Sequence, residues 1–241
     1  MAVKCGGTDA TSGIAANPAV GVMSDTIVDN GGTVLFSEVT ELLGAERVLA
    51  ERASSPAVAD QICQTIAKTE EKLRRIGTDP RFAHRGALIS TGNFDGGVSS
   101  VVEKALGGIY KAGNRSITGV VDYAEKPDGG GGVFLMDSPG HDGEVVTGFV
   151  GAGAQVVVFT TGRGTPTGFP FVPVIKVTGN SFTYDKMKEN IDINAGTIIS
   201  ENTDIKSKGR EIFEFVLAVS SGRKTQAEIL GHDELFCVTR V

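Results

Sequence analysis

The chain has 241 residues, of which 40% are hydrophobic and 22% charged, and its formal net charge is −6. This length permits one large α/β domain with a complete core, and the composition is that of a globular protein and not of a disordered or fibrous one. The negative charge, without any Lys/Arg-rich run, argues against partners such as nucleic acids or membrane surfaces, and no apolar segment approaches the ~18 residues of a membrane span.

Targeting and redox features are those of a cytoplasmic protein. The amino-terminal residues contain no apolar segment of the kind that a secretory signal needs. The three cysteines, Cys5, Cys63 and Cys237, are odd in number and lack CxxC spacing. This pattern suits a reducing compartment better than a disulfide framework, and it offers no structural zinc site.

The first predicted element is a helix. Asn17 and Pro18 have the character of an N-cap and a first helical position, and they predict a helix over 19–29 that ends at Gly31. Residues 1–9 are expected to come before any regular element.

The glycines ahead of this helix suit an anion. Gly6 and Gly7 precede the helix and would present free backbone N–H groups. Cys5 and Asp9 lie at the edge of this segment. Cys5 is either a small buried apolar side chain or a thiolate that binds a ligand.

A short apolar strand is predicted over 33–36, and acidic residues follow it at once. Glu38 stands at the carboxyl end of the strand, where a metal ligand or a base is often found. Alternatively, it is an acid favoured by the dipole at the start of a helix. Helices are predicted over 41–53 and from Pro56 to about Arg75, the second with a solvated charged face.

The next strand is predicted over 87–90, and a polar cluster that includes Asn93 follows it. Residues 98–111 have the spacing of an amphipathic helix. Lys104 on this helix is a possible base if it is buried, because desolvation lowers the pKa of a lysine. In the alternative interpretation it is the exposed partner of Glu103.

A strand over 133–136 ends in another acidic and hydroxyl cluster that contains Asp137 and His141. His141 is placed as a general base, since histidine titrates near neutral pH, or it is simply exposed. The glycines at 129–132 precede this strand, whereas a phosphate-binding loop must follow one. This placement, which the other glycine clusters share, disfavours an NAD-dependent oxidoreductase.

The strand over 156–159 is apolar and mostly β-branched, as in a strand buried on both faces. It runs into Thr160, Thr161, Gly162 and Arg163. Arg163 offers a planar pair of donors that suits a carboxylate or phosphate, or it is a solvated loop residue.

The last predicted elements are a strand over 173–177, a polar turn that contains Asn194, and an amphipathic helix over 204–220. In total, five apolar strands each end in a polar, Gly-rich loop. With right-handed crossovers these loops meet at one edge of a parallel sheet. We therefore predict a single domain over 1–241 with a three-layer, mostly parallel α/β fold that is Rossmann-like, with helices on both faces.

Six segments together resemble one enzyme family, and they cover essentially residues 3 to 236. They are KCGGTDATSGIAANPAVG from Lys4, LFSEVTELLGAE from Leu35, SSVVEKALGG from Ser99, VFLMDSPGHD from Val133, VVVFTTGRGTPTG from Val156 and DINAGT from Asp192. The resemblance is to the carboxy-terminal domain of the altronate and galactarate dehydratases, a family that includes sulfolactate sulfo-lyase large subunits.

This resemblance implies dehydration of a sugar acid to a 2-keto-3-deoxy acid with a divalent metal, typically Fe2+. It also implies partners: the amino-terminal and middle domains of the full enzyme, in cis or as a separate subunit, and a homo-oligomer. A non-catalytic scaffold or oligomerisation domain, or the sulfolactate branch, is the alternative.

The reaction assigns roles to the polar residues at the strand ends, since a doubly charged intermediate needs positive charge around it. The expected catalytic residues are Arg163, His141, Lys104 and Asp137. The expected substrate-binding residues are Thr160, Thr161, Gly162, Asn93, Asn194, Gly6 and Gly7. The expected metal ligands are Glu38, Cys5 and Asp9.

Overall fold

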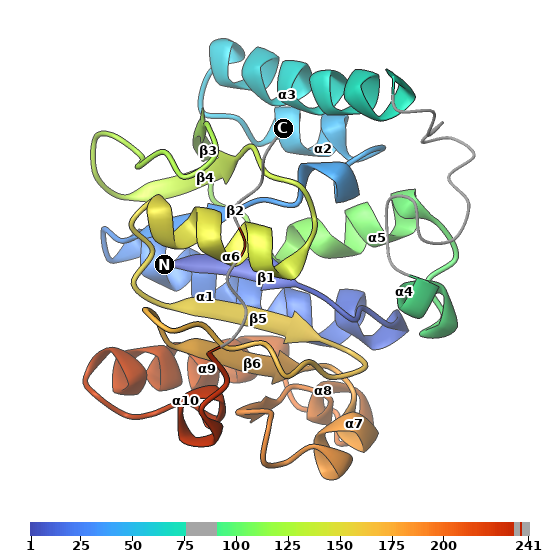
Figure 1. The fold of residues 1–241 in the computed structure, drawn as a ribbon, viewed down its shortest axis with the longest axis vertical. Coiled ribbons are helices and arrows are strands. Elements are labelled where there is room, and N and C mark those ends of the chain that lie inside the picture. Colours follow the sequence, from blue (N-terminus) through green and yellow to red (C-terminus); the bar gives the residue numbers. More distant parts are fainter. Residues whose placement is uncertain (76–90, 234–236, 238–241) are drawn as a thin grey trace.

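A computed structural model describes residues 1–75, 91–233 and 237, and these residues form a seven-stranded sheet flanked by helices (Figure 1). The strands are β1 (Ala2–Cys5), β2 (Thr33–Phe36), β3 (Ile117–Val121), β4 (Gly132–Met136), β5 (Val157–Thr161), β6 (Val174–Thr178) and β7 (Ile193–Asn194). Their order is β3-β4-β2-β1-β5-β6-β7, and all six pairings between neighbours are parallel.

The helices cover both faces of this sheet. They are α1 (Asn17–Asp29), α2 (Glu46–Glu51), α3 (Pro56–Arg75), α4 (Thr91–Asp95), α5 (Val101–Gly108), α6 (Asp142–Gly151), α7 (Ser181–Lys186), α8 (Thr197–Ser200), α9 (Ile205–Ser220) and α10 (Gln226–Leu230). A π-helix, η1 (Ser12–Ala16), leads into α1, and two 3-10 turns, η2 (Val39–Glu41) and η4 (Ile109–Ala112), follow β2 and α5. The predicted three-layer α/β fold is confirmed.

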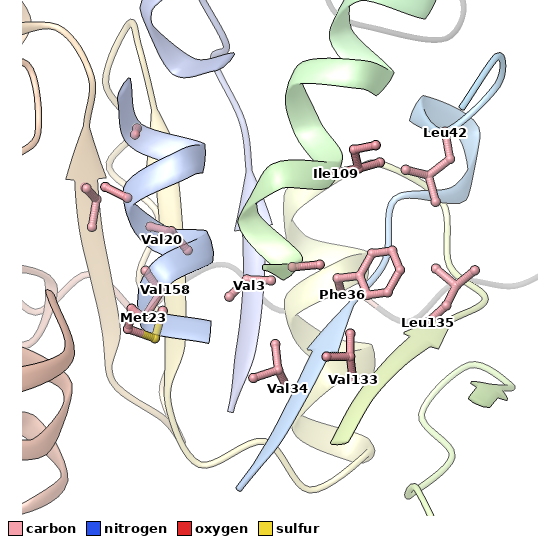
Figure 2. Packing of buried hydrophobic residues seen from close by; sticks show 14 of the residues in the cluster. Val3, Val20, Met23, Val34, Phe36, Leu42, Ile109, Val133, Leu135 and Val158 are labelled. Carbon is pink, nitrogen blue, oxygen red and sulfur yellow. The ribbon is translucent and has the colours of Figure 1, made fainter. Parts of the chain in front are cut away.

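Alternating side chains of the strands build two separate cores, one on each face of the sheet. Val3, Val34 and Val158 belong to the larger core (Figure 2). The helices α1, α3, α5 and α9 cover this core. Leu35 and Phe159 point the other way, into a smaller core under α6. Successive residues of one strand therefore face different helices.

The centre of the sheet is a strand that the sequence did not predict. Residues 2–5 form β1, which pairs with both β2 and β5, although residues 1–9 were expected to precede any element. The strand is only four residues long, and Lys4 interrupts its apolar pattern. Tertiary partners make that lysine acceptable in a buried strand, and local sequence does not reveal them.

Most of the other predicted strands are confirmed, with small shifts at their ends. The strands predicted over 33–36, 133–136, 156–159 and 173–177 are β2, β4, β5 and β6. The strand predicted over 87–90 lies outside the described residues. β3 and β7 were missed because one contains a threonine and a glycine and the other has only two residues.

Two helix predictions need correction, and the others are confirmed; the helix predicted over 98–111 is α5 followed by η4. Asn17 is not an N-cap, because η1 is already helical before it. The helix predicted over 41–53 is a 3-10 turn followed by the short α2. The helices expected from Pro56 and from Asp204 are α3 and α9, and Asp204 caps α9 through Ser207 N–H.

Candidate functional site

The carboxyl ends of β1 and β5 lie at a point where the order of the strands reverses. From β1 the chain passes to β2, whereas from β5 it passes to β6 on the opposite side. The loops after the two strands are joined, since the N–H groups of Gly162 and Arg163 donate to Gly7 O over 3.1 and 2.9 Å. Ligands of open parallel sheets bind at such points.

Lys4 is a fully buried lysine in the middle strand, on the face that α6 covers. Its Nζ lies 2.9 Å from Glu38 Oε1 and 2.7 Å from Asp142 Oδ1. Burial alone would lower the pKa of Lys4, but Glu38 and Asp142 raise it by more. The ammonium is therefore charged at neutral pH, although it has no contact with solvent.

Glu38 connects the two faces of the sheet just beyond β2. Its backbone is left-handed, with φ 73°, which is unusual for a residue with a side chain. Its carboxylate binds Lys4 on one side and Lys111 Nζ at 2.8 Å on the other, and it also accepts from Cys5 N. Glu38 is the N-cap residue of η2, as the alternative interpretation had it, but its side chain makes no capping hydrogen bond and binds the lysines instead.

Burial raises the pKa of Glu38, but Lys111 and Lys4 lower it by more, to about 2. The carboxylate is thus ionised at all physiological pH values. Lys111 was missed from sequence. It lies seven residues after Lys104, so both lysines project from one side of α5 and η4, and this spacing is the signal that could have found it.

Cys5 points to the opposite face from Lys4, toward the lysines of α5 and η4. Its Sγ lies 3.4 Å from Lys111 Nζ, 3.9 Å from Lys104 Nζ and 3.6 Å from Glu38 Oε2. Burial and Glu38 raise the pKa of the thiol, against the opposing effect of the two lysines. Cys5 is therefore a protonated thiol among charged groups.

Lys104 is buried, as a catalytic role requires, but its pKa does not move in the expected direction. Its Nζ pairs with Glu41 and not with Glu103, which instead binds Ser99. Burial lowers the pKa of Lys104, while Cys5 and Glu41 raise it by more. Lys104 is therefore a cation at neutral pH, and the expectation of a base with a lowered pKa is wrong.

These side chains form one unit, which we call the lysine–carboxylate cluster. It consists of Lys4, Cys5, Glu38, Glu41, Lys104, Lys111 and Asp142. Three ammonium groups face three carboxylates, so the cluster is neutral while Cys5 is a thiol. Such fixed charges in a dry site need no reorganisation when a ligand arrives.

A pocket of about 470 Å³ lies beside the cluster, and Lys104 belongs to its wall. Thr8, Asp9 and Asn17 also line it, and Ile14, Leu106 and Tyr110 contribute apolar surface. Thr8 is 5% exposed, and its Oγ1 has no hydrogen-bond partner among the described residues. A buried hydroxyl without a partner is costly, so a polar ligand in this pocket would satisfy it.

Several predicted site residues lie next to this pocket but serve the fold. Asp9 Oδ1 accepts hydrogen bonds from the N–H and hydroxyl groups of Thr11 and Ser12. Asp9 therefore already occupies these donors at the start of η1, where an anion was expected to bind. Asn93 Oδ1 accepts from Thr8 N. Thr160 is fully buried and donates to Asn17 Oδ1.

The glycines and Thr161 shape the loops at the same place. Gly6 N donates to Thr160 O, and a Cβ on Gly6 would meet the Phe159 ring at 2.8 Å. Gly7 has a φ of 58°. A Cβ on Gly162 would overlap the Asp9 side chain, and Thr161 Oγ1 accepts from Gly164 N. These residues hold the two loops together.

The remaining predicted residues lie away from the pocket wall. Arg163 is 47% exposed and donates to Gly92 O over 2.7 Å. His141 is exposed at the start of α6, and Asn194 accepts from Ser181 at the end of β7. Asp137 is half-buried beside α3, where burial raises its pKa. None of these four residues belongs to the lysine–carboxylate cluster, although His141 directly precedes its Asp142 at the start of α6.

The expected metal ligands are only partly brought together. Cys5, Glu38 and Glu41 offer ligand atoms within 4.8 Å of one another, whereas Asp9 is not a member of this group. Glu38 and Glu41 are already paired with lysines, and the ammonium groups would repel a divalent cation. As arranged, these residues do not fit Fe2+, and dependence on iron stays a prediction.

Comparison with known proteins gives a consistent result. The family described as D-galactarate/Altronate dehydratase, C-terminal, matches residues 1–241. The galactarate dehydratase (L-threo-forming) of Escherichia coli is 41% identical over 93% of this chain and 42% of its own length. The altronate dehydratase of Bacillus subtilis is 36% identical over 95% of this chain and 44% of its own length.

A third relative has a different name. The (2R)-sulfolactate sulfo-lyase subunit beta of Chromohalobacter salexigens is 35% identical over 100% of this chain and 61% of its own length. The chain thus spans roughly two fifths to three fifths of the curated relatives it matches. Among the described residues, no helix is long and apolar enough to cross a membrane.

Proposed function

Because the chain belongs to the D-galactarate/altronate dehydratase family and corresponds to its C-terminal domain, we propose that it supplies the cationic side of a sugar-acid hydro-lyase site. The observation that carries this proposal is the placement of Lys104. Lys104, whose buried ammonium is charged, lines a pocket whose Thr8 hydroxyl has no partner among the described residues. The substrate would be a sugar acid such as galactarate or altronate.

The chemistry of the reaction explains why such a wall is needed. Dehydration removes a proton from the carbon next to a carboxylate and expels the hydroxyl of the neighbouring carbon as water. After the proton leaves, two negative charges share the carboxylate. A preorganised cation in a dry site stabilises that charge, and removing a single well-placed donor of this kind costs about 3 to 4 kcal/mol.

The described residues have separate roles in this scheme. Lys104 would bind the substrate carboxylate, and Thr8 Oγ1 would bind a substrate hydroxyl. Glu38 and Lys111 would be positioning residues, because they hold the cluster that Lys104 joins through Cys5 and Glu41. Lys104 is charged at neutral pH, so the base that removes the proton must be another group.

The test is turnover by the complete enzyme that contains this domain, with Lys104→Met as the variant. We expect kcat/KM for the sugar acid to fall about 10²- to 10³-fold. The matched control is Lys188→Met, which removes an exposed lysine that pairs with Asp185 on the surface. Equal kcat/KM for Lys104→Met and the control would contradict the proposal and favour a scaffold domain.

The sulfo-lyase branch is the second candidate, because the match to that relative covers this whole chain. A sulfo-lyase expels sulfite where a dehydratase expels water, after loss of the same kind of proton. Assays with galactarate, altronate and sulfolactate, which detect both the 2-keto acid product and sulfite, separate the two. Sulfite release with sulfolactate, without turnover of either sugar acid, would replace the hydro-lyase assignment.

A further inference from the structure

The pocket beside Lys104 has an apolar rim of exposed side chains. Val102, Leu106 and Tyr110 recur every four residues along α5 and η4, so they share one side of this helical segment. They are 46%, 39% and 53% exposed, and Ile14 on η1 is 62% exposed. We call these four residues the apolar rim.

The apolar rim and the polar pocket wall belong to the same site. Ile14, Leu106 and Tyr110 line the pocket together with Thr8 and Lys104. A polyhydroxy acid is bound mainly through its hydroxyl and carboxylate groups, whereas clustered exposed apolar groups on a protein mark a contact with another protein surface. A cover there would also exclude water and strengthen the interaction of Lys104 with an anion.

The relatives indicate what provides this cover. The matched region is only 42% to 61% of their lengths, and one of them is named as a subunit beta. We propose that the part of the family's enzyme outside this domain binds the apolar rim through an apolar face of its own. In this position it covers the Lys104 pocket. This inference rests on the proposed function, and it adds the surface through which the site is completed.

The test measures how strongly the rim is protected from a thiol reagent, and it does not depend on turnover. Leu106→Cys is made in a background with Cys63→Ser and Cys237→Ser, which leaves Cys5 buried. Labelling by a thiol reagent is then compared between this chain alone and the complete enzyme, with its remaining part attached or added as a subunit. The matched control is Leu217→Cys on α9, since Leu217 is a helical leucine that is 44% exposed.

We expect labelling of Leu106→Cys to slow by about tenfold or more in the complete enzyme, with no change for Leu217→Cys. Tyr110→Cys serves as a second variant if Leu106→Cys fails to fold. Equal labelling rates of Leu106→Cys in the chain alone and in the complete enzyme would overturn the proposal. Slowing of Leu217→Cys labelling by the same factor as Leu106→Cys would also overturn it. Protection in this chain alone that grows with concentration would assign the rim to a second copy and also overturn it.

The two proposals fail in distinguishable ways. Protection of the rim together with normal turnover by Lys104→Met would leave the docking surface in place and remove the catalytic assignment. Loss of turnover in Lys104→Met with an unprotected rim would do the reverse.

Discussion

Two buried lysines in the same sheet differ in their surroundings, and the difference defines the candidate site. Lys4 in β1 and Lys176 in β6 lie in one row across the sheet, with Phe159 of β5 between them. Neither residue is exposed. Lys4 contacts two carboxylates, whereas Lys176 Nζ has no hydrogen-bond partner among the described residues.

The two pKa values move in opposite directions for this reason. Burial lowers the pKa of both lysines, but Glu38 and Asp142 reverse the shift for Lys4, while Asp192 only partly offsets it for Lys176. Burial alone therefore does not decide whether a lysine is charged. The carboxylates that the fold brings to the end of β1 make the lysine–carboxylate cluster ionic.

The largest expected effect comes from breaking the cluster at its centre. Glu38→Gln leaves Lys4 and Lys111 buried without their shared carboxylate, so the free energy of unfolding should fall by about 3 to 5 kcal/mol. Urea denaturation of the purified chain measures this loss. Glu51→Gln, which removes one member of an exposed ion pair, is the control with an expected change below about 1 kcal/mol. A similar small loss for both variants would show that the cluster is not a structural unit.

A smaller effect of the same cluster should appear on acidification. The pKa of Glu38 is about 2 in the folded protein against an ordinary value of 4.5, so its contribution is present above pH 4.5 and is lost as pH falls from 4.5 toward 2. This difference corresponds to about 3 kcal/mol. The free energy of unfolding, measured against pH, should fall more steeply in the native chain than in Glu38→Gln. Parallel curves over this range would contradict the lowered pKa.

The residues of the cluster show which parts of the site could be predicted from sequence. Glu38 and Lys104 were found because strand-end and helix positions follow from local pattern. Lys4 was not found from sequence. A lysine can be buried in a four-residue strand only when carboxylates pair with it, and these lie 34 and 138 positions away in the chain. The fold class followed from repeated strands and polar loops, whereas charge pairing depended on tertiary contacts.

Lys176 provides the contrasting variant, with a smaller change of opposite sign. Replacing it with methionine removes a buried amine without a partner and keeps a similar shape, so the free energy of unfolding should rise by about 1 kcal/mol. Lys4→Met should instead lower it, because Glu38 and Asp142 lose a partner. Urea denaturation of both variants tests the comparison directly. A loss of stability in Lys176→Met as large as in Lys4→Met would mean that the two lysines are equivalent.

The smallest effect is expected for Arg163, which the sequence predicted to be a catalytic residue. Arg163 is 47% exposed and donates to a backbone carbonyl of α4, with Asp95 at 3.8 Å. Water screens such an exposed charge, so Arg163→Ala should change the free energy of unfolding by no more than about 0.5 kcal/mol. In the complete enzyme, kcat/KM should fall by less than about tenfold, against the 10²-fold or more expected for Lys104→Met. If Arg163→Ala abolished turnover and Lys104→Met did not, the positive charge that matters would lie on the exposed loop after β5 and not in the buried cluster.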